Sequence, residues 1–575
     1  MKYFPQKLTI TWIKNSYKSK ELTVEELINE IIRRSEANKE KNVWITAPSM
    51  ELIKPYLDKL KDKKIEKCPL WGIPFAIKDN IDLKNIETTA ACKEYGYVPK
   101  ESAFVVKRLI EAGAIPVGKT NLDQFATGLV GTRSPYGEVH NSLNPELISG
   151  GSSSGSSVSV GLGEAAFSLG TDTAGSGRVP AALNCLVGYK PALGAWSTGG
   201  VVPACASLDC VTVFANNIED AELVNDAARG FDKDCCWSKE FEPINKKLPK
   251  KICLAKEGVE FYGPYKDVYE KKWKNAVSRI KNLGIEVEYI DYTMFKKAAS
   301  ILYDGPWVAE RWKDLGGFVK ENPDKIFPVT KIILESGDNK EHTAAKVFEA
   351  MHELQKYRSI AAQILKDSVL IMPTAGGTYS REEVRNNPIE TNSNMGKYTN
   401  HCNLLNMSAI AIPENSRDKE IPFGITIFGL AEDEGVVLKT AEKFLESEST
   451  TLAVCGLHMK GMELENQLVE LNGQFKETTE TKACYKMIKL NIKPEKPGLV
   501  RVNNGGKSFE IDLYDIPTEN LGRFLLNVKS PLGIGNIELK DGRIVKGFIC
   551  ESYVESEAED ISNYSSFKEY KRNNK

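Results

Sequence analysis

The segment from residue 150 to residue 180 constrains the fold of this chain more than any other stretch. It contains two serine- and glycine-rich loops, residues 150–157 and 170–177, separated by an apolar run. Glycine lets a backbone turn tightly and lets another group approach its N–H groups. Residues 165–169, Ala-Ala-Phe-Ser-Leu, fit a short buried strand, so the second loop lies at a strand's carboxyl end. Open α/β sheets bind their ligands at such ends.

A flexible linker is the alternative for a stretch so rich in serine and glycine. Linkers do not alternate with apolar runs, whereas Val158, Val160 and Leu162 follow the first loop here. A linker also has no need of Asp172 and Arg178 on either side of one serine. The pattern therefore favours an ordered site.

The two loops resemble the amidase signature family, whose core joins Gly-Gly-Ser-Ser-Gly-Gly-Ser to Gly-x-Asp-x-Gly-Gly-Ser. Ser154 and Ala174 depart from that pattern, since each stands where the family usually has glycine, but both are small. The similarity extends over about residues 20–445. It implies a fold of class α/β, with a large mixed, mostly parallel sheet covered by helices. The helix and strand patterns that alternate over residues 102–118 agree with such a sheet.

The resemblance also implies a Ser–cis-Ser–Lys triad. Its members here are Ser176 as nucleophile, Ser152 as the bridging serine after a cis peptide bond, and Lys78 as base; the serines lie 24 positions apart. Lys78 ends an alternating apolar segment, residues 73–77, that reads as a strand. A lysine in that position is usually solvated. Beside the serine loops it becomes the candidate base, because the family places its lysine in the same Pro-x-x-x-Lys-Asp context.

Amide hydrolysis needs a nucleophile, a base, an oxyanion hole and a proton for the departing amine. The oxyanion hole is expected from the backbone N–H groups of Thr173, Ala174, Gly175 and Ser176. A free lysine has a pKa of ~10.4, so burial must lower the pKa of Lys78 before its amine accepts a proton through Ser152. The resemblance implies no metal and no cofactor.

Three substrate contacts follow from resemblance to the allophanate hydrolases of this family. Tyr303 and Arg311, eight positions apart, match a tyrosine and an arginine that hold the substrate, and the guanidinium fork suits a carboxylate. Gly128 belongs to a loop that lines the family's substrate pocket, although an ordinary glycine turn explains it equally well. From the residues alone, Arg311 is as readily a surface side chain paired with Glu310 or Asp314.

A rival motif lies inside the first loop. Residues 151–155 match Gly-x-Ser-x-Gly, the nucleophile elbow of α/β-hydrolases, with Ser153 as nucleophile. That elbow follows a buried strand, but residues 141–146 are polar and turn-like. It also needs a downstream histidine, for which the sequence offers His342, His352, His401 and His458. None of these has a recognisable context.

Length and composition bound the remaining classes. A chain of 575 residues exceeds one ordinary core, and 41% hydrophobic with 27% charged residues is typical of soluble globular proteins. The net charge of −2 gives no electrostatic reason to bind nucleic acid or a membrane surface. No signal region or bilayer-spanning segment is evident. Twelve scattered cysteines without a CxxC motif indicate reduced thiols in the cytoplasm.

Four segments are expected. Residues 1–445 form the amidase signature domain, and the polar residues 446–452 form a linker. Residues 453–552 resemble the allophanate hydrolase C-terminal domain, an α+β domain with a γ-glutamylcyclotransferase-like fold. The charged residues 553–575 are expected to be a frayed tail.

These resemblances imply that allophanate, a small molecule, is hydrolysed to ammonia and carbon dioxide. They further imply a homodimer, and urea or biuret nitrogen catabolism as the setting. Because no biotin-carboxylase region is present, a urea carboxylase on another chain or a biuret-forming route is expected to supply the allophanate. His458 is a candidate for a late decarboxylation, though a lone histidine is more often structural. The alternatives are another amidase signature amidohydrolase, an aminoacyl-tRNA amidotransferase component, and a non-catalytic scaffold on this fold.

Overall fold

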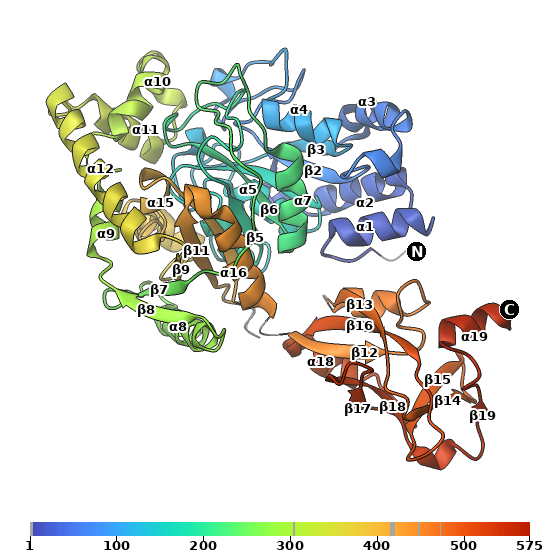
Figure 1. Cartoon of the computed structure of the whole chain (residues 1–575). Coiled ribbons are helices and arrows are strands. Elements are labelled where there is room, and N and C mark those ends of the chain that lie inside the picture. Colours follow the sequence, from blue (N-terminus) through green and yellow to red (C-terminus); the bar gives the residue numbers. More distant parts are fainter. Residues whose placement is uncertain (1–3, 303–304, 415–419, 447–448, 472, 575) are drawn as a thin grey trace. The chain divides into compact units, whose positions relative to one another are not determined.

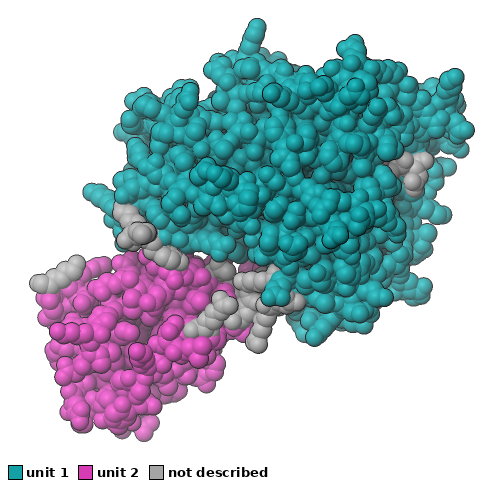
Figure 2. Space-filling model, turned by 180° about the vertical axis from the view of Figure 1, so that it is seen from behind, with its two compact units in different colours: residues 1–442 teal, residues 443–575 magenta. Residues whose placement is uncertain are grey.

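Two compact units make up the chain, residues 1–442 and residues 443–575 (Figures 1 and 2). The computed structural model describes residues 4–302, 305–414, 420–446, 449–471 and 473–574. Within those ranges, no helix combines the length and the apolar character needed to cross a lipid bilayer.

The larger unit is built on an eleven-stranded sheet in the order β1-β3-β2-β4-β6-β5-β10-β11-β9-β7-β8. Its strands are β1 Trp44–Thr46, β2 Pro74–Lys78, β3 Ile115–Thr120, β4 Phe167–Asp172, β5 Val187–Lys190, β6 Cys210–Ala215, β7 Lys251–Ala255, β8 Glu286–Ile290, β9 Val369–Pro373, β10 Met407–Pro413 and β11 Gly424–Leu430. The sheet is mixed, as predicted.

The direction of the strands corrects one part of that prediction. Six of the ten neighbouring pairs in the described sheet are antiparallel, including the run from β4 to β9 across its centre. Parallel pairs join β3, β2 and β4, and again β9, β7 and β8. The helix and strand of residues 102–118, which suggested a parallel sheet, belong to the group of parallel strands β3, β2 and β4. The strands at the centre of the sheet do not follow this helix-strand alternation.

Helices pack around this sheet (Figure 1). They are α1 Ile10–Lys18, α2 Val24–Ala37, α3 Met50–Lys61, α4 Phe104–Glu111, α5 Ser154–Gly161, α6 Val179–Leu183, α7 Ile218–Ala228, α8 Lys266–Lys281, α9 Thr293–Ser300, α10 Val308–Glu321, α11 Pro328–Glu335, α12 Ala344–Leu365, α13 Arg381–Asn386, α14 Glu390–Met395, α15 His401–Leu404 and α16 Glu434–Glu446. Helix α5 packs against β2, β3 and β4. Its residues are serine, glycine and valine, and such small side chains let a helix lie close to strands while buried nearly all round.

The pairing of β2 with β4 positions the candidate site. The two strands are parallel neighbours, with Ile77 opposite Leu169. Parallel strands end at the same edge of a sheet, so Lys78 and Asp172, which end β2 and β4, come together although 94 positions separate them. The serine loops adjoin that edge.

The smaller unit has a five-stranded sheet, β13-β16-β12-β18-β17, and a three-stranded sheet, β15-β14-β19. Its elements are β12 Ser449–Val454, α17 Glu465–Glu470, β13 Gln474–Glu480, β14 Tyr485–Leu490, β15 Lys496–Arg501, β16 Glu510–Pro517, α18 Thr518–Leu525, β17 Leu532–Glu538, β18 Ile544–Cys550, β19 Glu559–Asp560 and α19 Phe567–Asn573.

Two boundary predictions for this unit are wrong. Strand β12 begins at Ser449, inside the segment that was predicted to be a linker. The expected tail, residues 553–575, contains β19 and α19, and Phe567 and Tyr570 are buried in the unit's core. Because charged residues surround these two aromatic residues in the sequence, the segment reads as a solvated tail. In the structure, burial of the two aromatic side chains holds α19 in place.

Candidate active site

Lys78 and Ser152 are in direct contact at the edge of the sheet. The Lys78 side chain is completely buried, and its Nζ donates to Ser152 Oγ at 2.8 Å and to Thr171 Oγ1 at 2.7 Å. The Gly151–Ser152 peptide bond is cis. A Cβ on Gly151 would lie 2.1 Å from Asp123 Oδ2, so only glycine fits at that position. Two of the three predicted triad residues thus meet, with Thr171 as a partner that sequence reasoning missed.

Ser176 lies near the end of the second loop and is 3% exposed. Its hydroxyl takes part in none of the hydrogen bonds found among the described residues. Gly175 needs to be glycine because its φ is +138° and a Cβ would lie 2.3 Å from Thr399 Oγ1. Ala174, which replaces a family glycine, is not among the described residues of positive φ, so its methyl group causes no strain there.

One of the four backbone amides predicted to form the oxyanion hole already has a partner within the protein. The Gly175 N–H donates to Asp172 Oδ1 at 2.9 Å, so it is already engaged. The N–H groups of Thr173, Ala174 and Ser176 donate to no group in the part of the chain that the structure describes. Three amides of the predicted four therefore remain available for a developing oxyanion.

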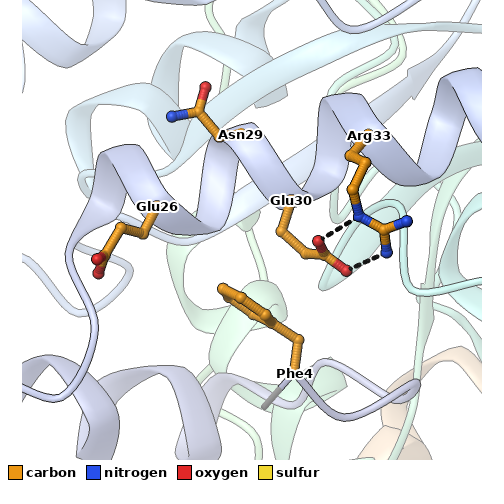
Figure 3. Close-up of a pocket in the computed structure, with 5 residues that line it drawn as sticks. All are labelled: Phe4, Glu26, Asn29, Glu30 and Arg33. Carbon is orange, nitrogen blue, oxygen red and sulfur yellow. Dashed lines mark hydrogen bonds and ion pairs between the residues drawn. The ribbon is translucent and has the colours of Figure 1, made fainter. Parts of the chain in front are cut away.

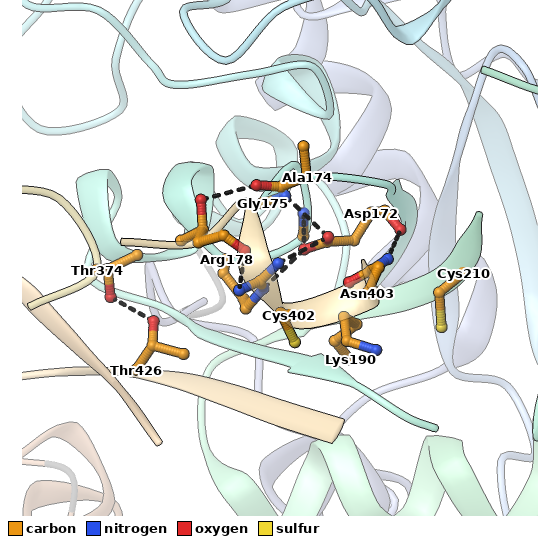
Figure 4. A network of polar contacts seen from close by, with 12 residues as sticks. Asp172, Ala174, Gly175, Arg178, Lys190, Cys210, Thr374, Cys402, Asn403 and Thr426 are labelled. Atoms are coloured by element: carbon orange, nitrogen blue, oxygen red, sulfur yellow. Dashed lines mark hydrogen bonds and ion pairs between the residues drawn. The ribbon is translucent and has the colours of Figure 1, made fainter. Parts of the chain in front are cut away.

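A buried ion pair shapes this loop (Figure 4). Arg178 Nε and Nη2 each donate to one oxygen of Asp172 at 2.9 Å, and both side chains are completely buried. Gly177 N–H donates to the same carboxylate at 3.0 Å. Burial favours the neutral acid, but the charge of Arg178 prevails and holds the pKa of Asp172 below its usual value. The carboxylate thus fixes the turn that presents Ser176.

Burial also sets the protonation of the candidate base. It lowers the pKa of Lys78 from 10.5 to about 7, against the opposing charges of Asp123, Asp209 and Asp172. At neutral pH a large fraction of the amine is therefore uncharged. A neutral amine has two N–H groups and one lone pair. An N–H given to Thr171 leaves the lone pair for the Ser152 hydroxyl, so Thr171 orients the base.

Arg311 faces inward from α10. It is 3% exposed, and its Nη1 donates to Thr127 Oγ1 at 3.1 Å. The guanidinium thus touches the residue before Gly128, in the loop that was predicted to line the substrate pocket. A Cβ on Gly128 would lie 2.6 Å from Asp123 Oδ2, so this glycine is also required by packing. Tyr303 lies outside the described residues.

The surface interpretation of Arg311 is wrong. Asp314 pairs with Lys313 at 2.7 Å, and the Glu310 carboxylate accepts hydrogen bonds from the backbone N–H and the hydroxyl of Ser207. Arg311 is instead a buried cation close to the serine loops. Its burial could not be read from an interrupted helical pattern.

The rival elbow lacks its structural context. No strand precedes Ser153 in residues 141–150, where the chain forms turns and isolated bridges. The Ser153 hydroxyl donates to Thr171 O at 3.0 Å and accepts from Thr171 N–H at 3.3 Å. It acts as a structural link between α5 and β4.

His458 is held in the smaller unit by neighbours of its own. It stacks on Phe548 and meets Phe524 edge-on, with centroids 5.5 and 5.3 Å away. Its Nε2 lies 2.9 Å from Gln467 Oε1, and burial lowers its pKa. These contacts are those of a packed side chain, and its role in decarboxylation stays a prediction.

A surface hollow on the larger unit lies apart from the predicted site (Figure 3). It is lined by Phe4, Glu26, Asn29, Glu30 and Arg33. Glu30 pairs there at 2.7 Å with the exposed Arg33, which lies three positions further along the same helix. None of the predicted site residues belongs to it.

Comparison with known proteins identifies both units. Residues 26–438 match the Amidase family model, and residues 450–572 match the model described as Allophanate hydrolase C-terminal domain. The selenomethionine-substituted allophanate hydrolase of Kluyveromyces lactis has a solved structure with a TM-score of 0.71 and 37% identity. The match covers 99% of this chain and 99% of that one.

Longer and shorter relatives complete the comparison. The chain is 38% identical over 577 residues to the urea amidolyase of Saccharomyces cerevisiae, covering 92% of this chain but only 31% of that protein. One component of the glutamyl-tRNA(Gln) amidotransferase of Prochlorococcus marinus is 30% identical and matches 76% of this chain over 96% of its own length.

The protonation of Lys78 predicts how Ser176 reacts with a fluorophosphonate probe. Only the neutral amine accepts a proton through Ser152, so the labelling rate should rise with pH and level off above an apparent pKa of about 7. Mass spectrometry of the labelled peptide at each pH measures the rate. A rate independent of pH between 5 and 9 (roughly two units around that pKa) would mean that Lys78 is not the base.

Replacement of Thr171 tests whether it orients the base. Thr171→Val keeps the volume but removes the oxygen that accepts from Lys78. Labelling should slow by ~10-fold or more, a part of the ~10²–10⁴-fold that a positioned base contributes. Thr171→Ser keeps the oxygen and should label at nearly the original rate. If the two variants label equally fast, the hydroxyl does not matter.

Proposed function

Because the chain belongs to the amidase family, we propose that it hydrolyses allophanate, urea-1-carboxylate, to ammonia and carbon dioxide. The observation that carries the proposal is the similarity to an allophanate hydrolase along 99% of both chains, second domain included. The buried Arg311 supports the carboxylate-bearing substrate, since a guanidinium suits a carboxylate. The Lys78–Ser152 contact supports the hydrolytic chemistry.

The first half of the reaction forms an acyl-enzyme. Ser176 attacks the ureido carbonyl while its proton passes to Ser152, whose own proton passes to the neutral Lys78. The amides of Thr173, Ala174 and Ser176 stabilise the negative oxygen that develops. The same relay returns the proton to the terminal nitrogen, and ammonia leaves.

The second half consumes one water molecule. Water attacks the acyl group with the relay acting again as base, and N-carboxycarbamate is released from Ser176. Loss of carbon dioxide gives carbamate, which decomposes to ammonia and a second carbon dioxide. Allophanic acid and water thus yield two molecules of each product. We assign the decarboxylation to the smaller unit, with His458 as its candidate residue.

The setting of this reaction is also a proposal. The chain spans about a third of the length of the urea amidolyases that it matches. We propose that a urea carboxylase on another polypeptide supplies its allophanate. A homodimer and a cytoplasmic location are proposed with it.

A second candidate is transamidation on misacylated tRNA. The amidotransferase component matches the larger unit over 96% of its own length, which favours this activity as the rival. The second domain and the buried Arg311 favour the hydrolase. A non-catalytic scaffold would have no use for a buried, partly neutral lysine.

Ammonia release from allophanate tests the proposal. The purified chain should release two ammonia molecules for each allophanate consumed, and Ser176→Ala should lower the rate by several orders of magnitude, leaving only the residual catalysis of the oxyanion hole and of binding. A coupled glutamate dehydrogenase assay measures ammonia. If the probe labels Ser176 but no ammonia is released, the chain is an amidase that acts on another substrate class. If the chain is neither labelled nor releases ammonia, the scaffold hypothesis is favoured.

Replacement of Arg311 tests carboxylate recognition. Arg311→Lys keeps a positive charge but loses the two-pronged donor, so kcat/KM for allophanate should fall roughly 10- to 100-fold, as for a lost charged hydrogen bond. The kcat/KM for biuret, which has a carboxamide in place of the carboxylate, should fall much less. Equal losses on both substrates would remove Arg311 from carboxylate recognition.

A further inference from the structure

Glu310, the neighbour of Arg311 on α10, is bound to one loop by three hydrogen bonds. Its Oε1 accepts from the Ser207 N–H at 2.8 Å. Its Oε2 accepts from the Ser207 hydroxyl at 2.6 Å and from the Cys205 thiol at 3.0 Å. The side chain is half-buried. The carboxylate therefore fastens the helix that carries Arg311 to residues 204–209, which we name the linking loop.

The other end of the linking loop is bonded to the nucleophile's loop. Asp209 accepts from the N–H groups of Ala204 and Cys205 at 2.8 and 3.1 Å, and so closes the linking loop on itself. The other oxygen of Asp209 accepts from the Thr173 hydroxyl at 2.5 Å. Thr173 is one of the three residues whose amides remain available for the oxyanion.

A second contact joins the same two loops. Asn403 Nδ2 donates at 2.7 Å to the carbonyl of Leu208 in the linking loop and at 2.7 Å to the carbonyl of Asp172. Figure 4 shows Asn403 beside Asp172. The linking loop is therefore held at Asp209 and Leu208 whether or not Glu310 is present.

The charges agree with this arrangement. Burial raises the pKa of Asp209 to about 6, while its hydrogen bonds and the positive charge of Arg311 act in the opposite direction. The guanidinium is thus close enough to Asp209 to act on its ionisation. Asp209 is therefore influenced by both parts of the site, through the hydrogen bond from Thr173 of the Ser176 loop and through the charge of Arg311.

We propose that Glu310 is a positioning residue for carboxylate recognition. By fastening α10 to the linking loop, it fixes the distance between the Arg311 guanidinium and the Ser176 hydroxyl. This proposal rests on the proposed function. A substrate held at both ends requires that distance to be kept, and misplacement by ~1 Å can cost ~10²-fold in rate. Loss of Glu310 should leave the linking loop in place and release only the helix.

A double-mutant cycle with Arg311 tests the inference. Glu310→Ala should lower kcat/KM for allophanate by ~10-fold, chiefly through KM, and leave fluorophosphonate labelling of Ser176 within about 2-fold. In an Arg311→Ala background, the same change should cost less than about 2-fold, because the guanidinium that it positions is gone. Glu310→Gln keeps the volume and one acceptor oxygen, and should lie between the wild type and Glu310→Ala.

A matched control lies on the same helix. Glu321 is exposed at the end of α10, and Glu321→Ala should change neither readout. Equal losses in allophanate turnover and in labelling would mean that Glu310 only stabilises the fold. Losses that add in the double variant with Arg311→Ala would mean that the two residues act independently. Either result overturns the proposal while leaving the proposed function intact. No ammonia from the unmutated chain overturns both.

Discussion

The structure depends on a lysine amine that has been removed from water without a carboxylate to pair with. The hydrogen-bond partners of the Lys78 amine in the described structure are two hydroxyl groups, those of Ser152 and Thr171. Lys119, on the neighbouring strand β3, is equally buried but lies 3.1 Å from Asp79. The charge of Asp79 favours the protonated amine of Lys119, although burial still lowers the pKa of this lysine. The unpaired one is left with a pKa near neutrality, and can therefore act as a base.

The groups around Lys78 serve geometry more than stability. Burying an ion pair such as Asp172 with Arg178 gains little over a well-packed apolar pair, but removing one partner leaves an uncompensated charge. The pair therefore holds the Ser176 turn in one shape. Asp123 does the same for the neighbouring loop of residues 128–133 by accepting the N–H groups of Gly131 and Arg133. Both carboxylates pre-organise the loops before any substrate arrives.

Local sequence patterns predict a structural element where the contacts that stabilise it are also local in the sequence. Helix α2 begins with a capping box formed by Thr23 and Glu26, three positions apart, and both of its hydrogen bonds are present. The contributions of Thr171, Asp209 and Glu310 were missed, because each acts on residues at least 36 positions away and no motif marks such a contact. The predictions of a mostly parallel sheet and of a frayed tail were wrong for the same reason. Each was extrapolated from a short stretch to parts of the fold that other segments decide.

The amino-acid sequence by itself determined the chemistry that is available. It supplies small residues that let the two serine loops turn tightly, a lysine at the end of an apolar strand, and a second domain of recognisable type. Only the tertiary structure decided which of these groups meet and in what state of charge. The pairing of β2 with β4 brings Lys78 to Ser152, and burial from all sides, which no single segment provides, lowers its affinity for a proton. The sequence left two interpretations of Arg311 open, a substrate contact and a surface ion pair. Packing of α10 buries the side chain, because solvent exposure is a property of the assembled fold.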